Sequence, residues 1–209
     1  MQPRCRQAVR HTPKFENMGL MIHSLEGMPE GHHRDYYIYL LDYGWDEPLG
    51  EALKNNFNRM ATLASEQKNA VVIMPTEVGA HFSDQVLSWH SINGDDADKE
   101  SLLPAILLTN RHPSEFRQRS LNQNTSVEND LKLVLFPLKK YCQSTTQVVE
   151  LIQKIFRKIK NGEALENFEI TKQKKKGLKG ALASSIVLEP KIMGMGISLN
   201  KLMSYFKEK

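Results

Sequence analysis

Acidic side chains gather where one apolar segment of this 209-residue chain ends. The segment closes with Asp42, and Asp46 and Glu47 follow a few residues later. Open α/β sheets bind ligands at the carboxyl ends of their strands, so these carboxylates, together with His90 and His112, form the candidate site of an enzyme of unfamiliar type. A structural explanation also accounts for two of them. Asp46 can cap a helix, and Glu47 suits the electropositive first turn of that helix.

Motifs of the familiar enzyme families are missing from the sequence. No GxxxxGK[ST] or GxGxxG loop follows an apolar segment, so neither common kind of nucleotide site is predicted. The two cysteines, Cys5 and Cys142, stand in no CxxC or CxxH spacing, which argues against a zinc site and against a disulfide framework. We expect Cys142 to be a structural thiol and the chain to use no metal or other cofactor.

The elements that would position these residues form an α/β pattern. The stretch YYIYLLD at 36–42 has no polar alternation, which predicts a central strand covered on both faces. A helix is expected to begin near Pro48, with apolar residues from Leu49 to Ala64 at helical spacing. Further strands are expected at 69–75, 102–110 and 131–138. A second helix is expected at 82–92, with Ser83 or Asp84 near its start, and a third at 144–161, which Ser144, Thr145 or Thr146 can cap and Asn161-Gly162 ends.

The order strand, helix, strand, helix, strand, strand, helix predicts the fold class. Short connections favour parallel pairing of the first two strands, and the last two strands can pair antiparallel. We therefore expect an α/β fold with a mixed sheet of about four strands flanked by helices. The apolar residues after Gly19 predict a short strand or turn that leads into the central strand.

Composition divides the chain into four parts. Residues 1–18 form a flexible basic arm, 19–162 the α/β domain, 163–180 a Lys-rich linker and 181–209 a small β-rich appendage. The appendage is too small to be stable alone, so it must dock on its own domain or on a partner protein. The apolar residues expected to make that contact are Ile192, Met193, Met195, Ile197, Leu199, Leu202 and Phe206.

The charge of the chain is mildly basic. Its 28 Lys and Arg against 24 Asp and Glu give a formal charge of +4, which alone does not indicate a nucleic-acid partner. Phosphates could nevertheless be contacted by the lysines of the linker, Lys172, Lys174, Lys175, Lys176 and Lys179. No aromatic residues interleave with these lysines as a stacking platform requires, so a solvated linker is the simpler explanation.

No apolar run approaches the roughly 20 residues that are needed to cross a bilayer. The N-terminal residues lack the apolar core of a signal peptide. We therefore expect a soluble, cytoplasmic protein without a membrane partner. Met18 is an alternative start position.

The turn after the central strand resembles that of thioredoxin-like proteins. In that family a central strand ends in a Trp-Cys-Gly-Pro-Cys turn that opens a helix, and a proline precedes a later strand on the far side of the site. The matching segments here are YIYLLDYGWDEPLGEAL and LLPAILLTN, and the matching residues are Trp45, Asp46, Glu47, Pro48 and Pro104. The resemblance covers about residues 35–162 and implies a cis peptide bond before Pro104.

Both cysteines of the family's turn are replaced here, by Asp46 and Leu49. Thiol-disulfide exchange proceeds by attack of a thiolate, so these positions cannot perform it. We predict a non-catalytic, thioredoxin-like interaction module, a subunit or adaptor whose turn and apolar tail contact another protein. One alternative is a nucleic-acid-binding protein that uses the basic arm, the Lys-rich linker and the basic side of the helix at 144–161, formed by Lys154, Arg157, Lys158 and Lys160. The other alternative is an enzyme with an unrecognised site.

Overall fold

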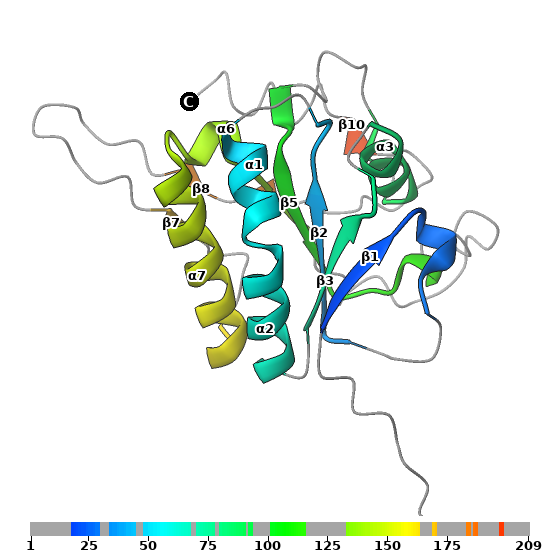
Figure 1. The fold of residues 1–209 in the computed structure, drawn as a ribbon, viewed down its shortest axis with the longest axis horizontal. Helices are drawn as coiled ribbons and strands as arrows, with labels where there is room; N and C mark the ends of the chain where they lie inside the picture. Colours follow the sequence, from blue (N-terminus) through cyan, green and yellow to red (C-terminus); the bar gives the residue numbers. More distant parts are fainter. Residues whose placement is uncertain are drawn as a thin grey trace, which may run out of the picture.

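Strand β2 (Tyr36–Leu41) lies in the middle of a mixed β-sheet (Figure 1). All of its residues except Tyr36 are buried, which confirms the prediction of a central strand covered on both faces. The computed structural model describes residues 18–29, 34–44, 48–67, 70–77, 80–90, 92–93, 101–115, 133–163 and four two-residue strands between 169 and 198.

The sheet runs in the order β1-β3-β2-β5-β6-β9. Its other strands are β1 (Gly19–Ile22), β3 (Ala70–Pro75), β5 (Ala105–Thr109), β6 (Leu133–Pro137) and β9 (Ile186–Val187). As predicted, β2 pairs in parallel with β3, and β5 pairs antiparallel with β6. The antiparallel pairing of β2 with β5 was not predicted. The expected number of about four strands was too low, because β1 joins the ladder beside β3 in parallel and β9 pairs with β6.

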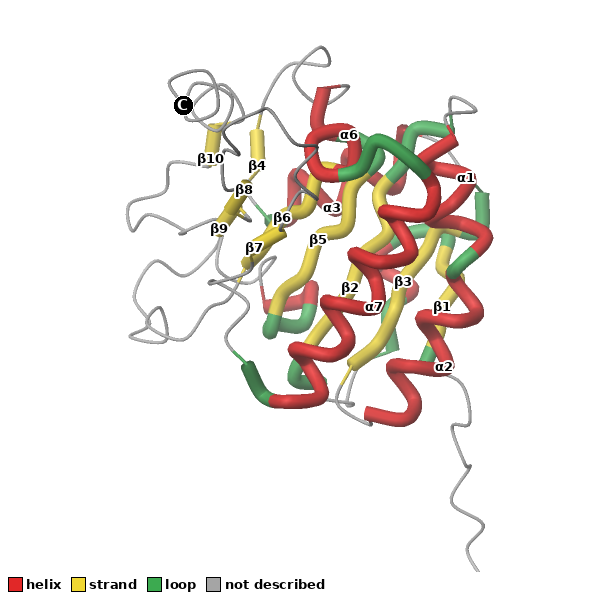
Figure 2. Tube along the Cα trace, turned by 90° about the vertical axis from the view of Figure 1, so that its left-hand side faces the viewer, coloured by secondary structure: helices red, strands yellow, loops and turns green. Residues whose placement is uncertain are grey.

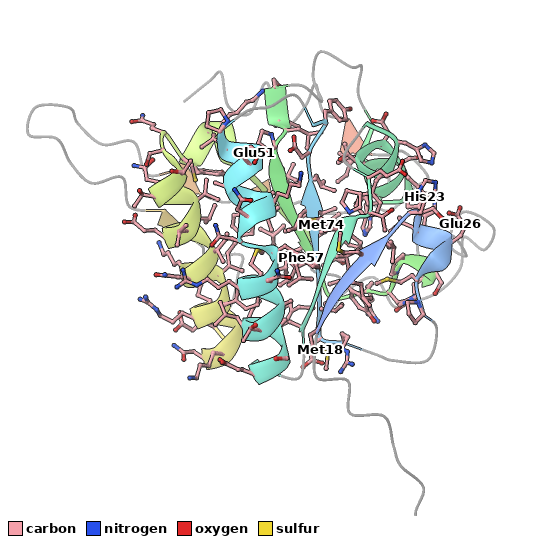
Figure 3. The ribbon with its side chains drawn as sticks, viewed as in Figure 1. Met18, His23, Glu26, Glu51, Phe57 and Met74 are labelled. Atoms are coloured by element: carbon pink, nitrogen blue, oxygen red, sulfur yellow. The ribbon has the colours of Figure 1, made fainter. Side chains whose placement is uncertain are left out.

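Three helices cover one face of the sheet (Figures 1 and 2). They are α1 (Pro48–Asn55), α2 (Phe57–Gln67) and α7 (Thr145–Asn161), and Phe57 packs from the first turn of α2 into the core that they share with the sheet (Figure 3). The prediction of a single helix with apolar residues from Leu49 to Ala64 was wrong, because Asn56 separates α1 from α2. The Ala52 carbonyl accepts two hydrogen bonds from Asn56, one from the side-chain amide at 2.8 Å and one from the backbone amide at 3.2 Å.

The opposite face of the sheet carries a second core beneath α3 (Ala80–Trp89) and the 3-10 helix η1 (Leu25–Gly27). The predicted helix at 82–92 extended too far. Ile92 belongs instead to β4 (Ile92–Asn93), because its backbone pairs in parallel with Ile197 of β10 (Ile197–Ser198).

Helix α7 has the ends that its sequence predicts. Ser144 is the N-cap, and its hydroxyl accepts a hydrogen bond from the Gln147 amide at 3.4 Å. Gly162 ends the helix with a φ of 64°, a left-handed conformation that favours glycine. The short helix α6 (Leu138–Tyr141), which connects β6 toward α7, was not predicted.

The C-terminal residues contribute four short strands. β7 (Glu169–Ile170) and β8 (Ala183–Ser184) pair with each other antiparallel, and β9 and β10 pair with β6 and β4. Figure 2 shows β7, β8 and β9 on the β6 side of the sheet. Across the ranges that the structure describes, no helix combines the length and apolar character that a membrane span requires.

Candidate functional site

Asp42 ends the central strand and is fixed there by α3. Its backbone amide donates to the Ser83 hydroxyl at 3.1 Å, and that hydroxyl donates to the Asp42 carbonyl at 2.9 Å. Ser83 is fully buried. The sequence suggested only that Ser83 lies near a helix start, so its link across 41 positions to β2 was missed.

The carboxylate of Asp42 lies between the turn and α1. Its Oδ1 accepts a hydrogen bond from the Gly44 amide at 3.1 Å, and Gly44 has a φ of 78°, which glycine adopts without strain. A Cβ at Gly50, in the first turn of α1, would collide with Asp42 Oδ2. The half-buried carboxylate therefore packs against the electropositive end of α1, where a negative charge is stabilised.

Pro104 lies next to Asp42 because of the register of the sheet. Leu41 pairs with Ala105, so the residue before Ala105 faces the residue after Leu41. Pro104 is buried, and its carbonyl accepts a hydrogen bond from the Leu138 amide at 2.8 Å. The Leu103-Pro104 peptide bond is cis, the geometry that the resemblance implies. On the other side of the turn, Pro48 is exposed.

Tyr43 adds a second link between the turn and α3, and sequence reasoning gave no sign of it. The Tyr43 hydroxyl donates to Asp84 Oδ1 at 2.9 Å. Asp84 was expected near the start of α3, where an acidic residue has a capping role. The other members of the predicted turn, Trp45, Asp46 and Glu47, lie outside the described residues.

Both candidate histidines pack on tyrosines of β2 rather than beside Asp42. The His90 ring meets Tyr39 at 5.3 Å between centroids, and the His112 ring meets Tyr37 at 5.5 Å, both edge to face. Tyr37 is five residues from Asp42, a distance of about 17 Å along a strand. The structure therefore does not bring Asp42, His90 and His112 together as the enzyme hypothesis requires.

His90 is a buried, neutral histidine. Its Nδ1 lies 2.7 Å from the Val86 carbonyl, so the ring donates from that nitrogen. Burial lowers the pKa of His90 to about 4, against the opposing effect of this hydrogen bond. An imidazole held neutral in this way is expected to stabilise the end of α3 rather than transfer protons.

His112 begins a short capped turn. Its Nδ1 accepts a hydrogen bond from the Ser114 amide at 3.2 Å and lies 2.7 Å from the Ser114 hydroxyl. The Glu115 side chain in return accepts from the His112 amide at 3.2 Å. This reciprocal pattern is that of a capping box, and it accounts for the proximity of serine and histidine without catalysis.

Cys142 is buried, in agreement with the expectation of a structural thiol. Burial, helped by the nearby Glu150 carboxylate, raises the pKa of Cys142 to about 11. A thiol in that state is a poor nucleophile near neutral pH. Within the described ranges, His, Cys, Asp and Glu side chains form no group of three that could hold a metal ion.

The residues of the two predicted binding surfaces fall mostly outside the described ranges. Among the partner-binding residues only Ile197 is described, as part of β10, and Ile192, Met193, Met195, Leu199, Leu202 and Phe206 are not. The linker lysines Lys172, Lys174, Lys175, Lys176 and Lys179 are not described either. The basic side of α7 also carries negative charge. Glu150 is exposed on this helix, and Lys158 Nζ lies 4.0 Å from Glu163 Oε2.

The end of β2 is thus a turn held by α3, α1 and the Pro104 loop. Its described residues and their partners on α3 offer two half-buried carboxylates, Asp42 and Asp84, each with a hydrogen bond, and no thiol or group of three metal-ligating side chains. This arrangement can present a surface, but the described side chains do not form a reaction centre. Comparison with protein-family models, with curated proteins and with solved structures finds no match to this chain.

Proposed function

We propose that the chain is a non-catalytic, thioredoxin-like interaction module that works as a subunit or adaptor of a larger complex. One observation carries the proposal: the pairing of Leu41 with Ala105 puts Pro104 beside the end of β2, next to the turn that opens α1. The resemblance implies this arrangement of turn and proline. Because Asp46 and Leu49 replace the family's cysteines, the turn can bind a partner but cannot exchange disulfides.

The rigid supports of the turn favour a binding role. Ser83 and Tyr43 fasten the end of β2 to α3, and Gly50 lets α1 approach the Asp42 carboxylate closely. A loop held by a rigid scaffold loses little conformational entropy when it binds. The absence of a disulfide framework from the sequence fits a reducing compartment, and we place the module in the cytoplasm.

Site-specific photo-crosslinking tests the proposal. Benzoylphenylalanine is introduced into the full chain at Pro48, which is exposed beside the turn, or at Glu66, which is exposed near the far end of α2. The two proteins are irradiated in extract from the source cells. We expect a discrete covalent adduct with another protein from the Pro48 position and none from the Glu66 position.

Two results would contradict the proposal. One is a chain that stays monomeric and yields no adduct from the Pro48 position. The other is the same set of adducts from both positions, which would mean that the crosslinker reports random collisions and that the turn is not a preferred contact surface.

A further inference from the structure

Strand β1 forms one edge of the sheet. In the part of the chain that the structure describes, β1 pairs only with β3 and stands at the end of the strand order (Figure 2). Proteins protect such an edge with a charged side chain, a proline, a bulge or a covering segment. The residues of β1, GLMI, include no charge and no proline, and their register with β3 is unbroken. The edge is therefore suited to pairing with a further strand.

The outward backbone groups of β1 belong to Gly19 and Met21. The Ile22 carbonyl accepts a hydrogen bond from the Thr76 amide at 3.0 Å, so the backbone of Ile22 points toward β3. Backbone polar groups alternate in direction along a strand. The amides and carbonyls of Gly19 and Met21 therefore point away from β3. The side chain of Met21 is also 52% exposed.

We propose that this edge binds a second copy of the chain, so that the two β1 strands pair antiparallel around a two-fold axis that passes between the two Leu20 residues. In that register Gly19 of each copy lies opposite Met21 of the other and exchanges both backbone hydrogen bonds with it. All outward groups of the two strands are then paired. An axis through Met21 would instead place Gly19 opposite His23, which lies beyond the end of β1.

The side chains of β1 favour an identical partner, because none of them carries a charge that its own copy would repel. Met21 lies on the same face of the sheet as Gly19, where a Cβ at Gly19 would lie 2.9 Å from Phe57 Cζ. Met21 of one copy therefore reaches the Phe57 ring of the other, and contacts between a thioether and an aromatic ring are favourable. On the opposite face, the half-buried Leu20 meets its own copy and continues the second core across the axis.

The flank of α2 beside β1 completes the contact. Two four-residue strands cannot by themselves bury the roughly 1,200 Å² that a stable interface needs. Ala61 marks the flank, because its Cβ would lie 2.7 Å from a Cβ at Gly19. Asn58 and Ser65 lie three residues before and four residues after Ala61, so they share its side of the helix. Both are uncharged, and the Ser65 hydroxyl already donates to the Thr62 carbonyl at 2.7 Å.

Sedimentation velocity of the full chain over a range of concentrations tests the proposal. Met21→Lys places a charge in the contact at a side chain that is exposed in the single chain, and Gln153→Lys adds the same charge on the exposed surface of α7. We expect the wild type and Gln153→Lys to dimerise alike. Met21→Lys should weaken dimerisation by about tenfold or more, because an edge lysine opposes strand pairing and its charge would be desolvated.

Disulfide crosslinking tests the register. Two single-cysteine variants, Leu20→Cys and Met21→Cys, are made in a Cys5→Ser background and exposed to glutathione disulfide, while Cys142 stays buried. Opposing residues at position 20 form a pair without hydrogen bonds, with Cα atoms about 4.5 Å apart and within disulfide range. Residues at position 21 lie diagonally, about 7 to 8 Å apart. We therefore expect Leu20→Cys to crosslink the two copies more readily than Met21→Cys does.

Three results would overturn the proposal. The first is a wild-type chain that stays monomeric at all concentrations. The second is a dimer that Met21→Lys weakens no more than Gln153→Lys does, since another surface would then hold it together. The third is a Met21→Cys chain that crosslinks more readily than Leu20→Cys, since the strands would then pair in another register. None of these results concerns the turn after β2, whose own test reads adducts from the Pro48 position.

Discussion

Several polar groups of this protein are buried against the central strand, and His90 is the one whose charge state should affect stability. It is almost completely buried, and its ring packs on Tyr39, whose hydroxyl is also buried. Burial lowers the pKa of His90 to about 4, and it raises the pKa of Tyr39 well above its ordinary value. Both groups are therefore neutral in the folded protein over the physiological pH range.

The lowered pKa of His90 predicts a loss of stability in mild acid. An unfolded chain takes up a proton at this histidine near pH 6.5, whereas the folded chain resists protonation until about pH 4. The contribution is therefore complete above pH 6.5, falls as the pH drops from 6.5 to 4, and amounts to about 3 kcal/mol at most. His90→Asn keeps a side-chain donor for the Val86 carbonyl and should remove this part of the pH dependence.

Urea unfolding between pH 7.5 and 4.5 measures the effect. His23→Asn is the control, because His23 is exposed on the chain between β1 and η1 (Figure 3). We expect the control to follow the wild type and His90→Asn to lose stability more gently toward acid. An identical pH slope in all three proteins would mean that His90 is not the group responsible.

At the level of elements, the contact between β1 and α2 depends on a missing side chain. A Cβ at Gly19 would lie 2.7 Å from Ala61 Cβ and 2.9 Å from Phe57 Cζ. Gly19→Ala should therefore push α2 away from the sheet and lower the free energy of unfolding by about 1 to 3 kcal/mol. Denaturant unfolding monitored by circular dichroism measures that change.

Gly27→Ala is the matched control for the same substitution. Nothing lies within 4 Å of a Cβ built at Gly27 in η1, so its effect should stay within about 0.5 kcal/mol. If Gly19→Ala proved as harmless as Gly27→Ala, α2 would not pack on β1 as closely as described.

Local sequence patterns predicted the helices and strands whose own residues determine where they form. Periodicity and the Ser144 and Gly162 caps defined α7, and an uninterrupted apolar run defined β2. The boundary between α1 and α2 at Asn56 was missed because the apolar spacing continues across it. Only long-range contacts made β1 recognisable as an edge strand of the sheet.

The candidate site was harder to predict than the helices and strands, because contacts between residues far apart in sequence form it. The sequence marked Asp42 and Pro104, and the register of β2 and β5 puts them side by side. It gave no sign of Ser83 as the residue that fastens the turn, because that link joins positions 41 apart. The grouping of His90 and His112 with Asp42 failed because residue types alone do not reveal where along a strand each side chain packs.

At the scale of the whole molecule, one sheet separates two cores. α1, α2 and α7 cover one, and α3 and η1 cover the other. The end of β2 is where both layers meet, since Asp42 contacts α1 through its carboxylate and α3 through its backbone. Contacts from both layers hold the turn, so its position depends on the whole fold. Introducing cysteines at the two positions that the resemblance implies therefore tests the proposed fold relationship.

The double variant Asp46→Cys with Leu49→Cys, in a Cys5→Ser background, introduces a Cys-Glu-Pro-Cys turn. The resemblance implies that these two positions stand three apart at a helix start, where Cα atoms are about 5 to 6 Å apart and within disulfide range. The helix N-terminus lowers the pKa of a thiol there, which stabilises the reduced form and makes the disulfide more oxidising. Glutathione disulfide would oxidise the two thiols to one disulfide and be reduced to two glutathione molecules.

The matched control is Arg59→Cys with Thr62→Cys, the same spacing on the exposed surface in the middle of α2. Both proteins are equilibrated with glutathione at fixed ratios, quenched with acid and counted for free thiols by mass after alkylation. If the turn is thioredoxin-like, its pair should close to an intramolecular disulfide that is reduced at a distinct, higher potential, whereas the control pair should form mainly mixed disulfides with glutathione. Indistinguishable behaviour of the two pairs would mean that the turn is an ordinary helix start, and the proposed relationship would fail.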